Sequence, residues 1–184
     1  MLIDEYLPQY DANEVHQTVI NAPIDRVYPL VRALDLRHSV LSPPFRLWQR
    51  AARWMTPGSP QRHRDGLSLQ NFLDHGFVLL AEQPPHEVVI GLTERVGLGE
   101  RVRPLEGEAF KNFHEPGFAK AAWNFSLHPL ESSRTRLVTE TRVLCNDPQS
   151  RRRFHVYWRF IRMFSGMIRL EFLRALKKAA ERPV

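Results

Sequence analysis

The feature that most constrains this chain is a long helical stretch near its C-terminal end. Asp147 and Pro148 form a strong helix start, because the carboxylate accepts amide hydrogens of the first turn and proline gives up only an amide that lacks a partner there. No further proline occurs before Pro183. The sequence therefore predicts a helix from Asp147 to about Ala180, roughly 50 Å long. Such a helix needs a large surface to lie on, which the rest of the chain is expected to supply.

Apolar residues recur along this stretch at steps of three and four, which predicts one apolar face. The main stripe comprises Phe154, Trp158, Ile161, Ile168, Phe172, Ala175 and Ala179, and it is widened by Tyr157, Phe160, Met163, Phe164, Met167 and Leu176. The opposite face is predicted to carry Arg152, Arg159, Arg162, Arg169 and Lys177. The aromatic and methionine side chains suit either a core or a surface that repacks around a bound molecule.

Most of the positive charge of the chain lies in the same stretch. Residues 149–184 hold ten Arg and Lys against two Glu, a net charge of +8, whereas the whole chain carries +6. Two interpretations stay open: a solvated helix back, or a docking surface for the anionic headgroups of a membrane. Nucleic acid binding is disfavoured, since exposed aromatic residues for base stacking are not evident.

The composition is that of a soluble globular protein. The 184 residues are 43% hydrophobic and 25% charged, which fits one domain, residues 1–184, with a sizeable core. Cys145 is the only cysteine, so a reducing, cytoplasmic environment is expected. No signal-like segment and no apolar run of about 18 residues occurs, so no membrane span is expected. The oligomeric state stays open.

Upstream of the long helix, the pattern predicts a strand, two helices and then a series of antiparallel strands. Residues 1–13 are expected to be an extended lead-in. The predicted strands are residues 15–20, 77–82, 87–93, 119–127 and 135–144, with a short strand near 110–114. One predicted helix begins after Ala22-Pro23, and a second spans residues 45–55. Turns such as Pro84-Pro85 are too short for parallel crossovers. This order predicts an α+β fold with helices on one face of an antiparallel sheet.

Several stretches in order support a more specific assignment. Residues 19–28 read as a strand, Ala-Pro and a helix, and they are followed by residues 77–82, 87–92, 121–125 and 139–143. Together these resemble the START-like superfamily (Bet v 1, polyketide cyclases and lipid-transfer domains), and a bacterial branch of it in particular. The resemblance covers about residues 14–180. It implies a helix-grip fold, in which a curved antiparallel sheet wraps around the C-terminal helix.

In a helix-grip fold the sheet and the long helix enclose a cavity, and strand alternation indicates which side chains line it. One face of residues 119–127 is apolar, and the corresponding face of residues 135–145 carries two threonines. The expected cavity lining is Trp123, Phe125, Thr139, Thr141, Tyr157, Phe160, Met163, Phe164 and Met167. The threonine hydroxyls are either ligand-binding groups in a mostly apolar chamber or ordinary, satisfied strand residues.

Four further polar residues are candidate anchors for a ligand. Glu140 and Arg142 lie on the other face of their strand and are expected to form a surface pair. If they point inward, they are candidates for a polar anchor or an acid–base pair, as are Asn124 and His114.

Metal and cofactor sites are not expected. No two of the eight histidines have metal-binding helical spacing, and Cys145 has no neighbouring ligand. Gly97 and Gly99 lack the third glycine and the following helix of a dinucleotide fingerprint.

Three functions remain open, because this superfamily contains binders, transfer proteins, cyclases and chaperone activators. The favoured hypothesis is binding of a hydrophobic small molecule such as a lipid, an isoprenoid or a polyketide. A cyclase or dehydratase acting on such a ligand is the first alternative, and it requires a titratable residue inside the cavity. A protein-interaction module with a filled core is the second.

Overall fold

The computed structural model describes residues 1–33, 73, 76–96 and 104–182. The strands β1 (Ala12–Ile20), β2 (Val78–Gln83), β3 (Glu87–Arg95), β4 (Phe118–Leu130) and β5 (Arg134–Cys145) form one antiparallel sheet in the order β1-β5-β4-β3-β2. The helices are α1 (Leu2–Tyr6), α2 (Ile24–Arg32), α5 (Gly107–Lys111) and α6 (Pro148–Ala180). The predicted α+β class, with a curved antiparallel sheet and a long C-terminal helix, is confirmed. The helix predicted at residues 45–55 lies outside the described residues.

The long helix begins and ends where the sequence predicts. Asp147 caps it, because one carboxylate oxygen accepts hydrogen bonds from the amides of Gln149 and Ser150, each at 2.9 Å. The other oxygen accepts a hydrogen bond from the amide of Gly117 at 2.7 Å, which ties the first turn of α6 to the start of β4. The hydrogen bond from the Ser150 hydroxyl, with those from the amides, lowers the pKa of Asp147 to about 2.

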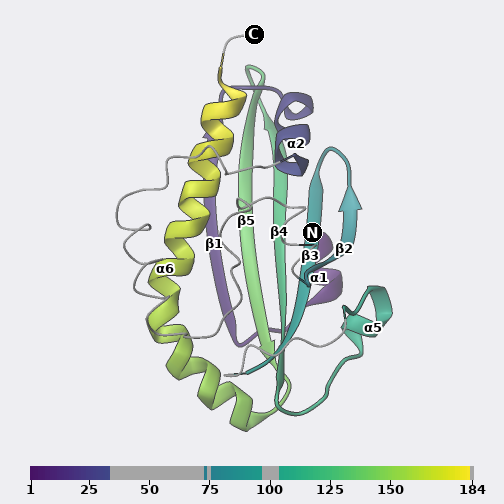
Figure 1. Ribbon diagram of the computed structural model, residues 1–184. Coiled ribbons are helices and arrows are strands. Elements are labelled where there is room, and N and C mark those ends of the chain that lie inside the picture. The colour runs from purple at the N-terminus through teal and green to yellow at the C-terminus, as the bar shows by residue number, and fades with distance from the viewer. Residues whose placement is uncertain (34–72, 74–75, 97–103, 183–184) are drawn as a thin grey trace.

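One face of the sheet, called here the inner face, is covered by α6 and α2; Figure 1 shows α6 running the length of the sheet beside β1 and β5. A larger apolar cluster joins β4 to the C-terminal half of α6. There the ring of Phe172 lies 5.4 Å from that of Trp123 and 6.3 Å from that of Phe125, measured between centroids. A smaller apolar cluster joins Phe154, near the start of α6, to Val143 of β5.

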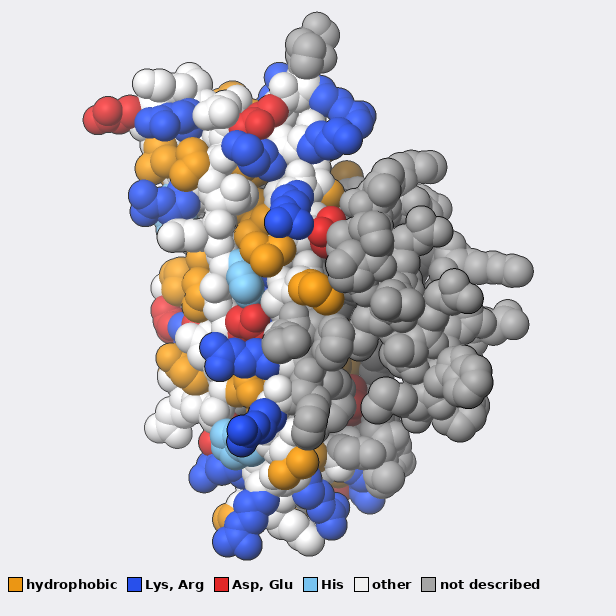
Figure 2. Space-filling model, turned by 90° about the vertical axis from the view of Figure 1, so that its left-hand side faces the viewer, with side chains coloured by type: hydrophobic (Ala, Val, Ile, Leu, Met, Phe, Trp, Pro, Cys, Tyr) orange, Lys and Arg blue, Asp and Glu red, His pale blue; other side chains and the backbone are white. Residues whose placement is uncertain are grey.

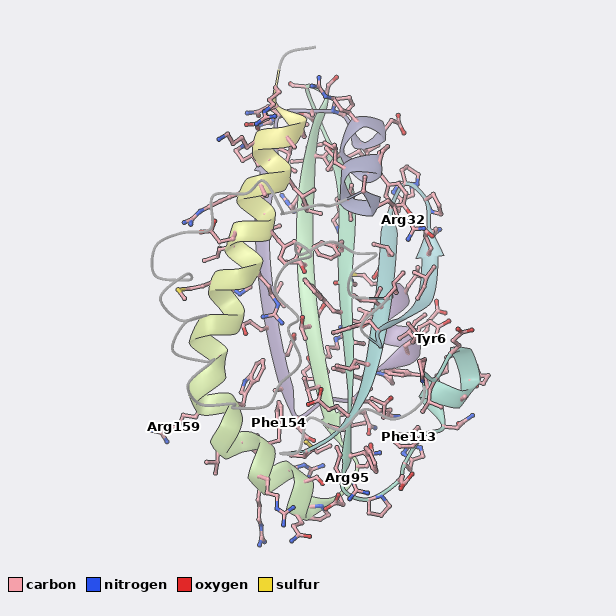
Figure 3. All side chains as sticks on the ribbon, in the orientation of Figure 1. Tyr6, Arg32, Arg95, Phe113, Phe154 and Arg159 are labelled. Carbon is pink, nitrogen blue, oxygen red and sulfur yellow. The ribbon has the colours of Figure 1, made fainter. Side chains whose placement is uncertain are left out.

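The predicted basic face of α6 is correct at several positions and wrong at one. Arg152 and Arg159 are exposed, and Figure 3 shows Arg159 pointing away from the sheet, whereas Arg169 is buried. The apolar stripe also shifts, so that Ala180 is buried and Ala179 is exposed. The reason is that α6 packs against both the sheet and α2, and these neighbours decide which line of side chains is covered. No helix in the described part of the chain combines the length and apolar composition that a membrane span requires.

The opposite face of the sheet, called here the outer face, is covered in part by α1 and α5. Residues 1–13 are not the predicted extended lead-in, because α1 occupies part of them. Ile3 and Leu7 are 0% and 1% exposed and belong to one cluster with Phe110 of α5. Their partners lie far along the chain, so no local pattern in residues 1–13 predicts this helix.

The short strand predicted near residues 110–114 is also wrong. The chain forms α5 instead, and this helix buries Phe110 on the outer face. The carboxylate of Glu108 lies 2.8 Å from the ammonium group of Lys111 three residues later. Residues three apart are neighbours on a helix but point to opposite faces of a strand, so this contact fits a helical turn.

Candidate functional site

Five polar side chains are buried or half-buried between the inner face of the sheet and α6. They are Glu14 and His16 of β1, Thr139 and Thr141 of β5, and Arg169 of α6, and we call them the inner polar group. The register brings them together, because Glu14 pairs with Thr141 and His16 pairs with Thr139. Along β1, β5 and α6 alike, the smaller apolar cluster lies on one side of this group and the larger cluster on the other.

Arg169 links α6 to the strands. Its Nε and Nη2 donate to Oγ1 of Thr141 at 3.1 and 2.7 Å, and its Nη1 lies 3.5 Å from Oε2 of Glu14. The guanidinium carbon lies 5.8 Å from the ring centroid of Trp123, within the range of a cation–π contact. Burial lowers the pKa of Arg169, and the charge of Glu14 acts in the opposite direction. Since arginine stays protonated in proteins, the site holds a positive charge in a largely apolar interface.

Glu14 is shared between two partners. Its Oε1 lies 2.9 Å from Nε2 of His16, and its Oε2 is the atom nearest Arg169. Gly166 lets this carboxylate approach α6, since a β-carbon at that position would lie 2.7 Å from Oε1. A glycine inside a helix costs about 1 kcal/mol relative to alanine. The close approach of Glu14 therefore gives a physical reason for glycine at this position.

The two predicted threonines have different roles. Thr139 accepts a hydrogen bond from Nε1 of Trp123 at 2.5 Å and donates one to the backbone carbonyl of Asn124 at 2.9 Å. Its hydroxyl is therefore satisfied within the sheet. Thr141 accepts two hydrogen bonds from Arg169 and so fixes the orientation of the guanidinium group.

The predicted lining residues of the strands face α6, as expected. Trp123 and Phe125 are 7% and 3% exposed and belong to the larger apolar cluster. Met167 of α6 is partly buried. The side chains of the other predicted lining residues lie outside the described part of the structure; these are Tyr157, Phe160, Met163 and Phe164. A ligand-binding role for the whole set stays a prediction.

Glu140 and Arg142 are not the predicted surface pair. They lie on the outer face, as alternation predicts, but α1 covers them and they are 5% and 6% exposed. Arg142 donates from Nε to Oε1 of Glu140 at 2.7 Å and from Nη1 to the carbonyl of Leu7 at 3.1 Å, and its Nη2 lies 2.8 Å from Oδ1 of Asp4. The prediction of a surface pair failed because α1, which covers this face of β5, is distant in the sequence.

Asn124 extends this outer polar network. Its Nδ2 donates to Oε1 of Glu87 at 2.6 Å, and its Oδ1 accepts a hydrogen bond from the amide of Glu140 at 2.9 Å. Glu87 in turn accepts hydrogen bonds from the amides of Leu2 and Ile3, at 2.8 and 3.4 Å, at the start of α1. The network thus binds α1 to the sheet through groups that satisfy one another.

The remaining candidates do not join either set. His114 is exposed beyond α5. Cys145 is a buried free thiol, and burial raises its pKa to about 12, so the reactive thiolate is scarce at neutral pH. Within the described residues, no three His, Cys, Asp or Glu side chains are grouped as a metal site requires.

No family model and no curated protein matches the chain. Solved structures match most of its length at low identity. They include a hypothetical protein from Helicobacter pylori (9% identity, TM-score 0.46, covering 97% of this chain and 94% of that one), the Zhui aromatase/cyclase from a Streptomyces species (15%, 0.32, 93% and 94%) and CalU16 from Micromonospora echinospora (16%, 0.32, 92% and 83%). With TM-scores below 0.5, these similarities support no conclusion about the function of this chain.

The sequence-based prediction missed Glu14, His16 and Arg169, although each had a signal. Alternation along β1 places Glu14 and His16 on the same face as the buried Ile20. Arg169 lies three and seven residues before Phe172 and Leu176, which is the spacing of a shared helix face. The spacing of Arg169 thus indicates a buried position, whereas its charge alone suggests an exposed one.

The inner polar group provides two kinds of chemistry. An arginine oriented by a threonine hydroxyl recognises a carboxylate, a phosphate or a carbonyl oxygen. A histidine beside a carboxylate is suited to accept or donate a proton.

Proposed function

We propose that this protein binds a hydrophobic small molecule, such as a lipid, an isoprenoid or a polyketide, between the inner face of the sheet and α6. The observation that carries this proposal is the inner polar group, in which the buried Arg169 and the half-buried Glu14 lie between two apolar clusters. A buried charged pair is often no more stabilising than hydrophobic residues of similar volume. A few polar groups among hydrophobic side chains are typical of pockets that orient a mostly apolar ligand.

Native mass spectrometry of the purified protein is the first test. A discrete additional mass that is lost on denaturation and recovered by organic extraction supports the proposal and gives the ligand class. If the protein carries no such mass, thermal shifts with fatty acids, isoprenoids and flavonoids decide the question. No shift with any of them would overturn the proposal and favour an interaction module with a filled core.

Two threonine-to-valine variants form a matched pair for the recovered ligand. Thr141→Val removes the hydroxyl that orients Arg169, so we expect the affinity to fall on the order of tenfold. Thr93→Val makes the same change on the outer face, where the buried Thr93 hydroxyl has no hydrogen-bond partner among the described residues. Its affinity should match the wild type. Equal losses in both variants would contradict a role of the inner polar group.

A cyclase or dehydratase acting on such a ligand is the second candidate, favoured by the 2.9 Å contact between His16 and Glu14. A carboxylate beside a histidine can orient it as a general base. For an enzyme, wild-type protein should convert the ligand into a product that chromatography and mass spectrometry distinguish. His16→Gln should bind the ligand without converting it. If the wild type returns the ligand unchanged, binding alone is the function.

We further propose that the exposed face of α6 contacts the anionic surface of a membrane in the cytoplasm. Arg152, Arg159 and Arg174 are exposed on this helix, and Val156 and Leu170 beside them are 65% and 39% exposed. Figure 2 shows Lys and Arg side chains spread along this side of the molecule, with hydrophobic side chains between them. Basic residues around apolar ones suit attraction to anionic headgroups combined with shallow insertion.

Flotation with lipid vesicles tests this contact. We expect binding to vesicles that contain phosphatidylserine, loss of binding at high salt, and no binding to phosphatidylcholine alone. Arg159→Glu with Arg174→Glu should abolish it. Arg134→Glu with Arg136→Glu reverses as many exposed charges away from α6 and should not. Equal binding to both kinds of vesicle would contradict the proposal.

A further inference from the structure

We infer that the ligand is an acid, that its carboxylate takes the position of Glu14 beside Arg169, and that its binding adds one proton to His16. This inference rests on the proposed function and names the chemical class of the ligand. It starts from the way in which Glu14 is divided between Arg169 and His16.

The distances indicate that a ligand carboxylate can replace Glu14 beside Arg169 while Glu14 stays with His16. Glu14 lies 2.9 Å from His16 but 3.5 Å from Arg169, so the contact with His16 is the closer of the two. A ligand carboxylate beside the guanidinium would therefore leave Glu14 with a partner. Thr141 holds Nε and Nη2 of Arg169, while Nη1 is the nitrogen directed at a carboxylate. The protein thus already presents this arginine to an acidic group.

An arginine in a largely buried site suits a carboxylate particularly well. Its planar guanidinium group forms charge-assisted hydrogen bonds to carboxylates that are about twice as strong as neutral ones. The aromatic rings of Trp123, Phe125 and Phe172 lie in the adjoining apolar cluster and offer contact for an apolar body. An amphipathic acid has a carboxylate for Arg169 and an apolar chain for these rings.

The balance of charges in the site predicts that His16 gains a proton when the ligand carboxylate binds. The charged and titratable groups described around His16 are Glu14 on its own strand and Arg169 on α6; β5 contributes Thr139 and Thr141, which are uncharged. With His16 neutral, Arg169 and Glu14 balance each other. An additional carboxylate leaves one negative charge uncompensated in a largely buried site, which is costly. A proton on His16 restores the balance and produces two paired sets, the ligand with Arg169 and Glu14 with His16.

Isothermal titration calorimetry with hexadecanoic acid and its methyl ester tests the inference. We expect the acid to bind on the order of tenfold more tightly than the ester. Titration in two buffers of different ionisation enthalpy should show proton uptake with the acid and none with the ester. By linkage, the affinity for the acid should rise up to about tenfold for each pH unit by which the pH falls.

Three variants and one control variant make the test specific. Arg169→Gln should bind the acid and the ester equally, whereas Arg162→Gln, at an exposed position of the same helix, should behave as the wild type. His16→Gln should bind the acid more weakly and without proton uptake. Glu14→Gln should bind the acid more tightly, also without proton uptake, because the competing charge is gone. This last variant gains affinity, so a folding defect cannot imitate it.

The possible failures are distinguishable. If the wild type binds neither probe, the proposed function fails for long-chain lipids and the inference fails with it. If the acid and the ester bind with equal affinity, the proposed function stands and the inference is overturned. Acid binding without proton uptake would overturn the role of His16.

Discussion

Each face of the sheet buries an arginine beside a glutamate, yet the two arginines have different environments. At Arg142 on the outer face, burial acts to lower the pKa, but the hydrogen bonds and charges of Glu140 and Asp4 outweigh it and raise the pKa. At Arg169 on the inner face, burial prevails over the charge of Glu14 and the pKa is lowered. Nearby charges and hydrogen bonds therefore outweigh burial at Arg142, whereas burial outweighs the charge of Glu14 at Arg169.

The helix α1 accounts for much of this difference. It supplies the carboxylate of Asp4 to Arg142 and its own first amides to Glu87, and Leu7, directly after the helix, supplies a backbone carbonyl to Arg142. The outer polar network is thus completed within the protein. A buried charge that pays a desolvation penalty is more often found where a ligand binds. The comparison predicts that substitutions on the outer face reduce stability, whereas substitutions on the inner face change ligand affinity more than stability.

The largest expected effect is the loss of stability in Arg142→Met. The substitution leaves Glu140 buried without its guanidinium partner, which should lower the free energy of unfolding by about 3–5 kcal/mol. Urea denaturation followed by circular dichroism measures it. Arg136→Met, at an exposed position of the same strand, is the control and should change little. A loss in Arg142→Met no larger than in the control would show that the outer polar network does not hold α1 in place.

Two glycine-to-alanine variants compare how tightly the faces are packed. In Gly91→Ala the new β-carbon meets Leu80 at 2.6 Å and Phe110 at 3.0 Å on the outer face, which should cost about 1–3 kcal/mol. In Gly166→Ala it meets the end of the flexible Glu14 side chain at 2.7 Å, and the helix gains up to about 1 kcal/mol in propensity. Gly166→Ala should therefore unfold within a few degrees of the wild type in a thermal melt. Equal destabilisation by both would mean that the inner face is packed as rigidly as the outer one.

Arg169→Met should have a smaller effect on stability than Arg142→Met. Methionine replaces a desolvated charge by an apolar side chain, and Glu14 keeps its contact with His16, so the free energy of unfolding should change by about 1 kcal/mol or less. Urea denaturation beside Arg142→Met measures this difference. A loss as large as that of Arg142→Met would remove the distinction between the two faces.

The smallest effect concerns Asp147, which joins the start of α6 to β4 through Gly117. Because the pKa of this carboxyl is lowered to about 2 in the folded protein, its contribution to stability is present above the unfolded pKa of about 4. It is lost as the pH falls from about 4 to about 2. As the pH falls across this range, the melting temperature should decrease more steeply for the wild type than for Asp147→Asn. Parallel curves would show that this cap does not couple α6 to the sheet.

Local signals in the sequence predicted most of the regular structure. Asp147-Pro148 located the start of α6, and alternation assigned Trp123 and Thr141 to the face toward that helix. The same methods failed for α1 and α5, because a single turn of helix has too few residues to show a period. They also misjudged Arg142, because the cover of a strand face depends on which distant segment folds over it.

What the sequence by itself determined is the succession of strands and the long helix, together with the apolar periodicity that makes α6 pack on a sheet. Periodicity and capping act within a few residues, so they can be read without a structure. Only the tertiary structure decided which charges are buried. The pairing of β1 with β5 sets Glu14 opposite Thr141, and the packing of α6 brings Arg169 from a distance of 155 residues to the same point. Burial and charge pairing depend on such long-range contacts, and these exist only once the chain has folded.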